Sequence, residues 1–189
     1  DGYSHLYWYS MGGNLIKKVT NGKFEVKDFL GWDQANNTFY FTSNEGSPLR
    51  TAVYKIDAKG KKTKLSTQEG SNSAIFSKNM KYFVNTYSSA NIPPVITLND
   101  NKGKVLTTLV DNQKLKQQMS GLNMPSKEFF TFKTTDGVEL NGWIMKPAHF
   151  DTNKKYPVIL HQYSGPGSQQ VLDRWGIGAM GNGGLFEAY

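Results

Sequence analysis

The feature that most constrains the fold is a pattern of short strands that recurs about every 45 residues. In each copy an apolar strand is followed by a polar or glycine-containing turn and then by a second strand. Three copies can be aligned: residues 6–10 with 15–20, 52–56 with 61–66, and 95–98 with 104–110. Chains with a period of this length build arrays of small sheets. The repeat therefore predicts outer hairpins of consecutive, similar units.

A second pair of strands precedes two of these hairpins. Residues 29–32 precede 38–42, and residues 73–76 precede 81–85, with turns rich in Asn, Asp and Ser between them. Four antiparallel strands per unit is the arrangement of a β-propeller blade. Residues 1–110 are thus predicted to form two whole blades and half of another, and we expect the chain to begin within a blade. Closed propellers carry four to eight blades, so these units alone cannot close a ring.

The pattern changes after residue 110. Residues 111–125 read as a linker with a short helix, because Leu115 and Met119 stand four apart on one helical face and Pro125 marks a boundary. Two strands, 127–135 and 138–146, are then joined by Asp136-Gly137, a strong hairpin signal. A second unit is therefore predicted from residue 126 onward.

This second unit contains the stretch to which the chemistry points. Residues 158–160 are a short apolar run bounded by Pro157 and Gly165, which favours a buried strand of a largely parallel sheet. Tyr163 then lies at the carboxyl end of that strand, where open α/β sheets bind ligands. The glycine-rich segment 176–184 is interpreted as an irregular loop. The other reading, a phosphate-binding loop, is weaker because Gly181-Asn-Gly-Gly184 matches neither G-x-G-x-x-G nor the P-loop pattern in context, and an irregular loop explains the glycines without a ligand.

Composition excludes several classes of function. The chain has no cysteine, which removes disulfides, thiol catalysis and cysteine-bound metals, and no apolar stretch reaches the length of a membrane-spanning helix. The net charge of +7 is concentrated in lysines around residues 55–64, which we interpret as a solvated hairpin edge rather than a nucleic-acid surface. Ligand-type residues are too dispersed for a metal site, and no cofactor is predicted.

Several motifs carry a resemblance to a known family. They include Ile-Pro-Pro-Val-Ile-Thr-Leu at 92–98, Pro-Ala-His-Phe-Asp at 147–151, Lys-Lys-Tyr-Pro at 154–157 and Tyr-Ser-Gly-Pro-Gly-Ser-Gln at 163–169. With them the chain resembles the dipeptidyl peptidase IV branch of the prolyl oligopeptidase family, from about residue 1 to residue 175. The resemblance implies the last blades of a β-propeller at 1–110, the linker at 111–125, and the start of an α/β-hydrolase domain at 126–189. The expected fold is mainly β, with four-stranded antiparallel sheets.

The resemblance also implies an activity. Members are serine exopeptidases that release N-terminal dipeptides, preferring Pro or Ala at the second position, through an acyl-enzyme formed by a Ser-Asp-His triad. It further implies peptide substrates, a homodimer, contact with the rest of the same polypeptide, and a periplasmic or extracytoplasmic location. The G-x-S-x-G nucleophile motif is absent from residues 1–189, so the triad is expected elsewhere and this chain alone is expected to be inactive.

One functional residue carries over, Tyr163. By resemblance its hydroxyl donates to the oxyanion of the tetrahedral intermediate. A phenol with an ordinary pKa near ~10 stays protonated at neutral pH and can serve as such a donor. The alternative is a tyrosine that only packs against the propeller. A different class of function also stays open, that of a β-rich module that binds a partner through exposed blade edges.

Overall fold

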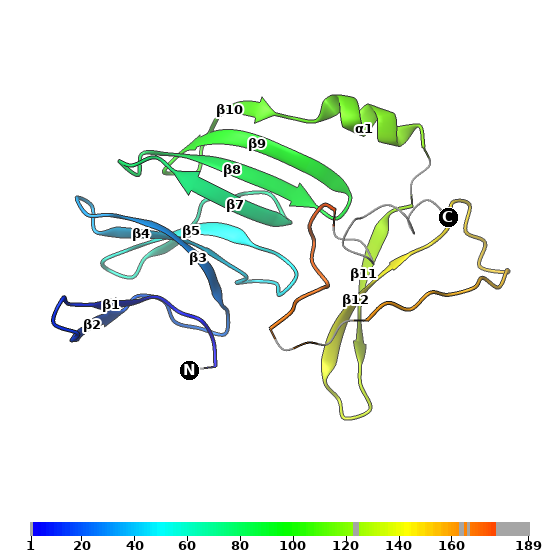
Figure 1. The fold of residues 1–189 in the computed structure, drawn as a ribbon, viewed down its shortest axis with the longest axis horizontal. Coiled ribbons are helices and arrows are strands. Elements are labelled where there is room, and N and C mark those ends of the chain that lie inside the picture. Colours follow the sequence, from blue (N-terminus) through cyan, green and yellow to red (C-terminus); the bar gives the residue numbers. More distant parts are fainter. Residues whose placement is uncertain (1, 123–124, 163–164, 166, 177–189) are drawn as a thin grey trace.

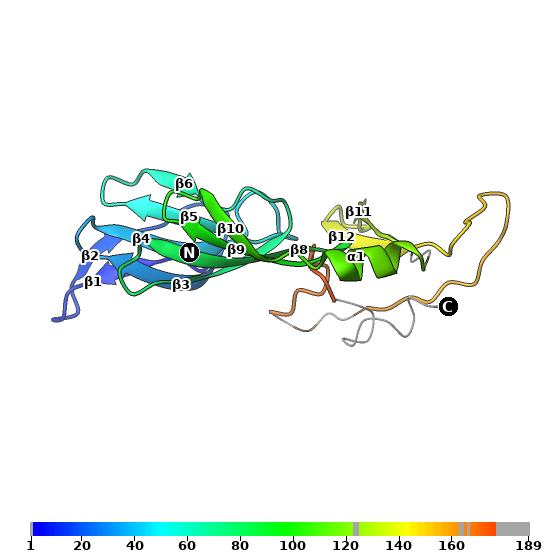
Figure 2. The ribbon, with the colours of Figure 1, turned by 90° about the horizontal axis from the view of Figure 1, so that it is seen from above.

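The computed structural model describes residues 2–122, 125–162, 165 and 167–176. Two stacked sheets lie at one end of an elongated molecule, and a separate hairpin lies at the other (Figures 1 and 2). The first sheet has the order β3-β4-β5-β6 and the second β10-β9-β8-β7, with antiparallel neighbours throughout. The strands of these sheets are β3 (Val26–Asp33), β4 (Thr38–Ser43), β5 (Ala52–Asp57), β6 (Lys62–Lys64), β7 (Ser71–Phe76), β8 (Tyr82–Ser89), β9 (Ile92–Asp100) and β10 (Val105–Val110).

The remaining elements flank these sheets. A two-stranded ribbon of β1 (Tyr7–Tyr9) and β2 (Leu15–Lys18) precedes them. The helix α1 (Gln113–Ser120) and the hairpin β11 (Lys127–Lys133) and β12 (Glu139–Met145) follow. The predicted two blades and a half, the short helix and the hairpin turned at Asp136-Gly137 are therefore confirmed.

Strand β4 forms the centre of the core because both of its faces are covered. All six of its residues are buried. Side chains alternate across a strand, so Phe39 and Phe41 pack toward the β1–β2 ribbon and Tyr40 packs toward the second sheet. The first cluster holds together Val19, Phe24, Val26, Phe39, Phe41, Ala52, Tyr54 and Ile56.

The second cluster joins the two four-stranded sheets. Tyr40 and Val53 from the first sheet meet Phe83 from the second, with Leu65 and Ala74 completing the cluster. Phe76 lies against both Tyr40 and Phe83, with ring centroids 4.4 Å and 4.8 Å away. A single parallel bridge between Thr51 and Ser71 also links the sheets. Face-to-face stacking of four-stranded sheets is the packing of neighbouring propeller blades.

The buried parallel strand predicted at 158–160 was wrong. Val158, Ile159 and Leu160 lie outside any strand and are 84%, 76% and 88% exposed. A strand needs neighbours to accept its backbone hydrogen bonds and cover its side chains, and every sheet in the described part of the chain is antiparallel. The predicted α/β-hydrolase sheet is therefore not seen within the described residues. None of the described helices has the length and apolar character needed to cross a membrane.

Candidate functional site at the junction of the two sheets

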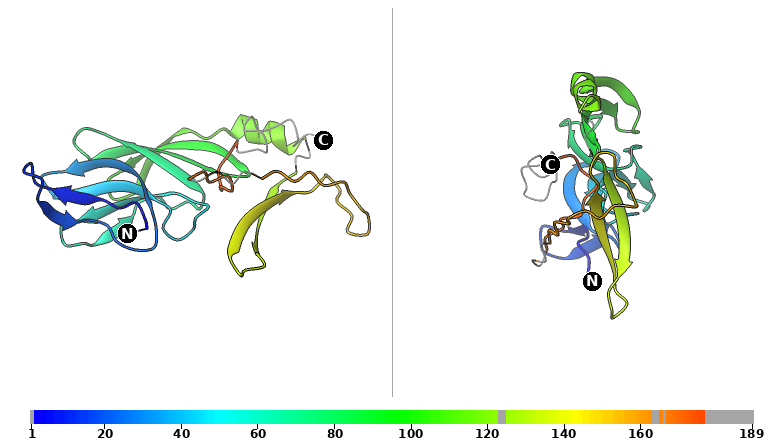
Figure 3. Two further views of the ribbon diagram at one scale, coloured as in Figure 1. Left: turned by 60° about the horizontal axis from the view of Figure 1, so that its bottom comes forward. Right: turned by 90° about the vertical axis from the view of Figure 1, so that its right-hand side faces the viewer.

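The segment 171–176 returns to the edge where the two stacked sheets meet, although it lies about a hundred residues further along the chain than the strands it contacts. In Figures 1 and 3 this red segment lies at the edge where β7 begins and β8 ends. Asp173 is its buried residue, with 7% of its surface exposed. Charged residues are rarely buried unless they are paired, so the partners of Asp173 define this site.

Every polar atom of Asp173 has a partner in the two sheets or in the turns that connect their strands. Its backbone N–H donates to the carbonyl of Leu49 at 2.9 Å, and its own carbonyl accepts from the Ser71 hydroxyl at 3.0 Å. The carboxylate Oδ1 accepts from the backbone N–H of Ala90 at 2.9 Å, and Oδ2 accepts from Nε of Arg50 at 3.0 Å. Leu49 and Arg50 belong to the β4–β5 loop of the first sheet, whereas Ser71 begins β7 and Ala90 lies in the β8–β9 turn of the second sheet. Asp173 therefore ties both sheets to the downstream chain.

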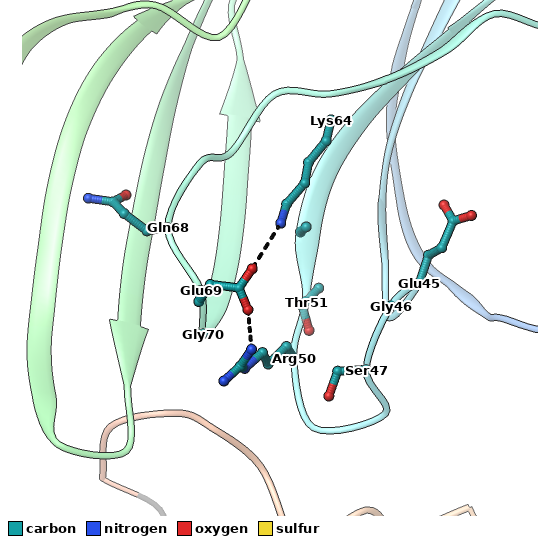
Figure 4. A pocket seen from close by; sticks show the side chains of 10 residues that line it. Glu45, Gly46, Ser47, Arg50, Thr51, Lys64, Gln68, Glu69 and Gly70 are labelled. Carbon is teal, nitrogen blue, oxygen red and sulfur yellow. Dashed lines mark hydrogen bonds and ion pairs between the residues drawn. The ribbon is translucent and has the colours of Figure 1, made fainter.

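Arg50 extends this contact into an ion-pair network on the surface (Figure 4). Its guanidinium pairs with Glu69, and Glu69 also lies 3.7 Å from the Lys64 ammonium. The side chain of Glu69 is 64% exposed, so its pairs contribute little, as exposed ion pairs usually do. The Arg50–Asp173 pair is less exposed to solvent because the Asp173 side chain is only 10% exposed. The buried carboxylate therefore makes the stronger of the two contacts of Arg50.

A small hollow adjoins this network. It is lined by Glu45, Ser47, Arg50, Lys64, Gln68 and Glu69, among others, and has a volume of about 90 Å³ (Figure 4). Sites for drug-sized ligands measure about 300–1,000 Å³, so this hollow by itself does not hold a peptide. Glu69, which lines the hollow, also accepts a hydrogen bond at its backbone carbonyl from the Tyr87 hydroxyl at 3.1 Å. Burial raises the pKa of that hydroxyl. The residues around the hollow thus belong to the contacts that hold the two sheets and the downstream chain together.

Two lysines of the cluster at 55–64 bond to residues outside their own hairpin, which the sequence did not indicate. Lys62 pairs with Glu45 at 2.6 Å, and the Lys55 ammonium donates to the carbonyl of Asn101, in the β9–β10 turn, at 2.9 Å. Part of this cluster therefore connects structural elements, and the prediction of a merely solvated edge was incomplete.

A second junction joins the β8–β9 turn to the β11–β12 hairpin. The Asn91 side chain donates through Nδ2 to the Lys127 carbonyl at 3.0 Å and accepts the Lys127 backbone N–H through Oδ1 at 2.9 Å. An amide used in this way imitates a neighbouring strand. Trp175 also donates its backbone N–H to the Ser88 hydroxyl at 3.3 Å. The β8–β9 region therefore holds the downstream chain at Ser88, Ala90 and Asn91.

The predicted site residue, Tyr163, lies outside the described residues, and so do most of the glycines at 176–184. Sequence reasoning missed Asp173 and Arg50, because they are 123 residues apart and neither sits in a recognisable motif. Nothing in the sequence pattern could have paired them. Among the residues that the structure describes, no group of three or more His, Asp or Glu side chains is placed to hold a metal ion.

The stacked four-stranded sheets define a β-propeller protein, and comparisons narrow this class to a family. Residues 1–94 match the model of the dipeptidyl peptidase IV (DPP IV) N-terminal region. A probable dipeptidyl-aminopeptidase B from Podospora anserina is 36% identical over 184 residues, which cover 94% of this chain and 20% of that protein. A probable dipeptidyl peptidase 4 from Aspergillus flavus is 30% identical over 177 residues, which cover 92% of this chain and 23% of that protein.

Solved structures that match this chain come from the same family as these relatives. The crystal structure of Porphyromonas gingivalis dipeptidyl peptidase 4 matches with a TM-score of 0.88 and 48% identity, covering 93% of this chain and 25% of that one. A putative dipeptidyl aminopeptidase IV from Bacteroides ovatus matches with a TM-score of 0.75 and 30% identity, over 98% of this chain and 27% of that one. The chain belongs to the dipeptidyl peptidase IV family. It spans between a fifth and a quarter of the length of the curated relatives it matches.

Proposed function

We propose that residues 1–189 are part of a serine exopeptidase that releases dipeptides from the N-termini of peptides, preferring Pro or Ala at the second position. The observation that carries this proposal is the likeness to P. gingivalis dipeptidyl peptidase 4 over 93% of the chain at 48% identity. The names of the curated relatives support the same activity. They favour a peptidase over a binding module that acts through its blade edges.

Within this proposal the chain supplies part of the protein scaffold and one catalytic group, the hydroxyl of Tyr163. Residues 1–110 are blades of the propeller, 111–125 are a linker, and 126–189 begin the catalytic domain, whose Ser-Asp-His triad lies in another part of the polypeptide. The substrates are peptides, and the assembled enzyme is a homodimer. The contacts of Asp173 and Asn91 support this division, since both join the blades to the chain after residue 126.

Tyr163 is the oxyanion donor of the proposed reaction. Its phenol hydroxyl donates a hydrogen bond to the negatively charged oxygen that forms when the serine attacks the scissile carbonyl. The bond strengthens as charge develops, so it lowers the barrier more than it tightens substrate binding. The family motif Tyr-Ser-Gly-Pro-Gly at 163–167 supports this assignment.

The test is Tyr163→Phe in the polypeptide that carries both this chain and the triad, assayed with a chromogenic Gly-Pro amide. We expect kcat to fall roughly 10²- to 10³-fold, the usual loss for one oxyanion donor, with KM changed far less. Phe keeps the ring, so packing is preserved. Tyr156→Phe is the matched control, because its hydroxyl serves a loop by accepting the Asp151 N–H at 3.0 Å. Unchanged turnover in Tyr163→Phe would contradict the role.

A further inference from the structure

We infer that the β8–β9 turn is a latch that docks two parts of the downstream chain, the segment 171–176 and the β11–β12 hairpin, as one unit. Only two residues, Ala90 and Asn91, stand between β8 and β9. The backbone N–H of Ala90 donates to Oδ1 of Asp173, whereas the side chain of Asn91 bonds the backbone of Lys127. Neighbouring residues share a planar peptide, so they do not reorient independently. The two contacts therefore form and break together.

The segment 171–176 is held at the turn through a backbone donor that has little access to water. Ala90 and Asp173 are each 7% exposed. A buried N–H without a partner is costly, so loss of the carboxylate forces the turn to shift until water reaches the Ala90 N–H. The Ser88 hydroxyl, which accepts the Trp175 N–H at 3.3 Å, ties the end of β8 to the same segment. The conformation of the turn thus depends on the docked segment.

The hairpin is held at the same turn by both ends of one amide. Nδ2 of Asn91 donates to the Lys127 carbonyl at 3.0 Å, and Oδ1 accepts the Lys127 N–H at 2.9 Å. Two bonds to one residue fix direction as well as distance, and hydrogen bonds weaken steeply when they are bent. A turn that shifts therefore loses the hairpin. Lys127 is the first residue of β11 and is buried, so this loss frees the start of the hairpin from the blade.

A short turn shared by two contacts couples their free energies. Docking of the segment orders the turn for the hairpin, and docking of the hairpin orders it for the segment, by the same factor in each direction. Contacts that share a structural element in this way show an interaction energy in double-mutant cycles. Release of the latch is thus one local opening that frees both parts from the blades, instead of two separate openings.

The experiment is a double-mutant cycle in the polypeptide that contains residues 1–189, with amide hydrogen exchange as the readout. The Lys127 amide reports on the hairpin, and the Asp173 amide, which donates to the Leu49 carbonyl at 2.9 Å, reports on the segment. Asp173→Ala should speed exchange at Lys127 roughly 3- to 10-fold, and Asn91→Ala should speed exchange at Asp173 by a similar factor. In the Asn91→Ala background, Asp173→Ala should change exchange at Lys127 less than about twofold, because the contact through which it acts is already gone.

Asn101→Ala is the matched control, since it removes a side-chain amide bond to the Met80 carbonyl at 3.0 Å from the turn at the other end of β9. Neither reporter should change in it. The amides of β4 should keep their rates in every variant, which separates release of the latch from general unfolding. If Asp173→Ala does not fold, Asp173→Asn replaces it. This variant loses the charge that faces Arg50 and should speed exchange at Lys127 about two- to threefold.

Three results would overturn the latch. Unchanged exchange at Lys127 when Asp173 is replaced, or at Asp173 in Asn91→Ala, would leave two independent contacts. An acceleration at Lys127 that is as large in the Asn91→Ala background as in the wild type would show that Asp173 does not act through the turn. An acceleration that extends to β4 would show an effect on the stability of the blades alone. None of these results bears on the proposed peptidase, which is tested by hydrolysis.

Discussion

Gly60 and Gly103 occupy equivalent turns of the repeat, but only one of them is enclosed. Both have a positive φ, 86° and 92°, and each donates its N–H to the aspartate that opens the turn, Asp57 or Asp100. A Cβ at Gly60 would meet nothing within 4 Å, whereas a Cβ at Gly103 would lie 2.6 Å from the Leu65 carbonyl oxygen. The pair therefore separates the cost of the backbone conformation from the cost of close packing between sheets.

We predict that Gly103→Ala destabilises the protein more than Gly60→Ala. Both variants force an L-residue into the left-handed region, at about 1–2 kcal/mol each. Only Gly103→Ala also pushes against the Leu65 backbone, which adds about 1–3 kcal/mol. Urea denaturation of the two variants in the same polypeptide measures the difference in the free energy of unfolding. Equal losses would show that the turn of the second sheet can move away from the first at no cost.

At the scale of single elements, the β8–β9 turn places the hairpin. We predict that Asn91→Ala speeds hydrogen exchange of the Lys127 amide about 5- to 30-fold, because the two hydrogen bonds that it removes are worth about 1 kcal/mol each. Asn91→Asp keeps the acceptor and should have a smaller effect.

The control for this prediction is Asn101→Ala, which removes a side-chain hydrogen bond to Met80 at 3.0 Å but lies away from the hairpin. Exchange at Lys127 should match wild type in that variant. If Asn91→Ala also leaves it unchanged, the hairpin is held to the blade by other contacts.

The structural elements differ in how well they can be predicted from the sequence. Strand β4 was predictable because its Thr-Phe-Tyr-Phe-Thr run suits a strand whatever surrounds it, and the turns at 57–60 and 100–103 carry their own Asp and Gly signals. Residues 158–160 have an equally strong apolar signal, yet their burial depends on neighbours that the run does not specify. The Asp173–Arg50 contact joins positions 123 residues apart, and no local pattern encodes such a pair.

At the scale of the whole molecule, much apolar surface of this chain is left uncovered. All six residues of β10 are exposed, as are Phe130, Phe132 and the run Val158 to Leu160. Monomeric proteins rarely leave contiguous apolar surface of this kind open to water. Surface of this kind favours association, and a net charge of +7 opposes it only through weak, salt-screened repulsion.

We therefore predict that residues 1–189 by themselves self-associate and do not hydrolyse a Gly-Pro amide. Light scattering should give a mass that rises with protein concentration, and the assay should show no turnover because the triad is missing from these residues. Ile159→Asp should lower the association, since Ile159 is 76% exposed within the apolar run. Thr152→Asp adds the same charge to an exposed polar loop and should leave the mass unchanged. A dilute monomer with one sharp cooperative melt would contradict the first expectation, and measurable turnover would contradict the second.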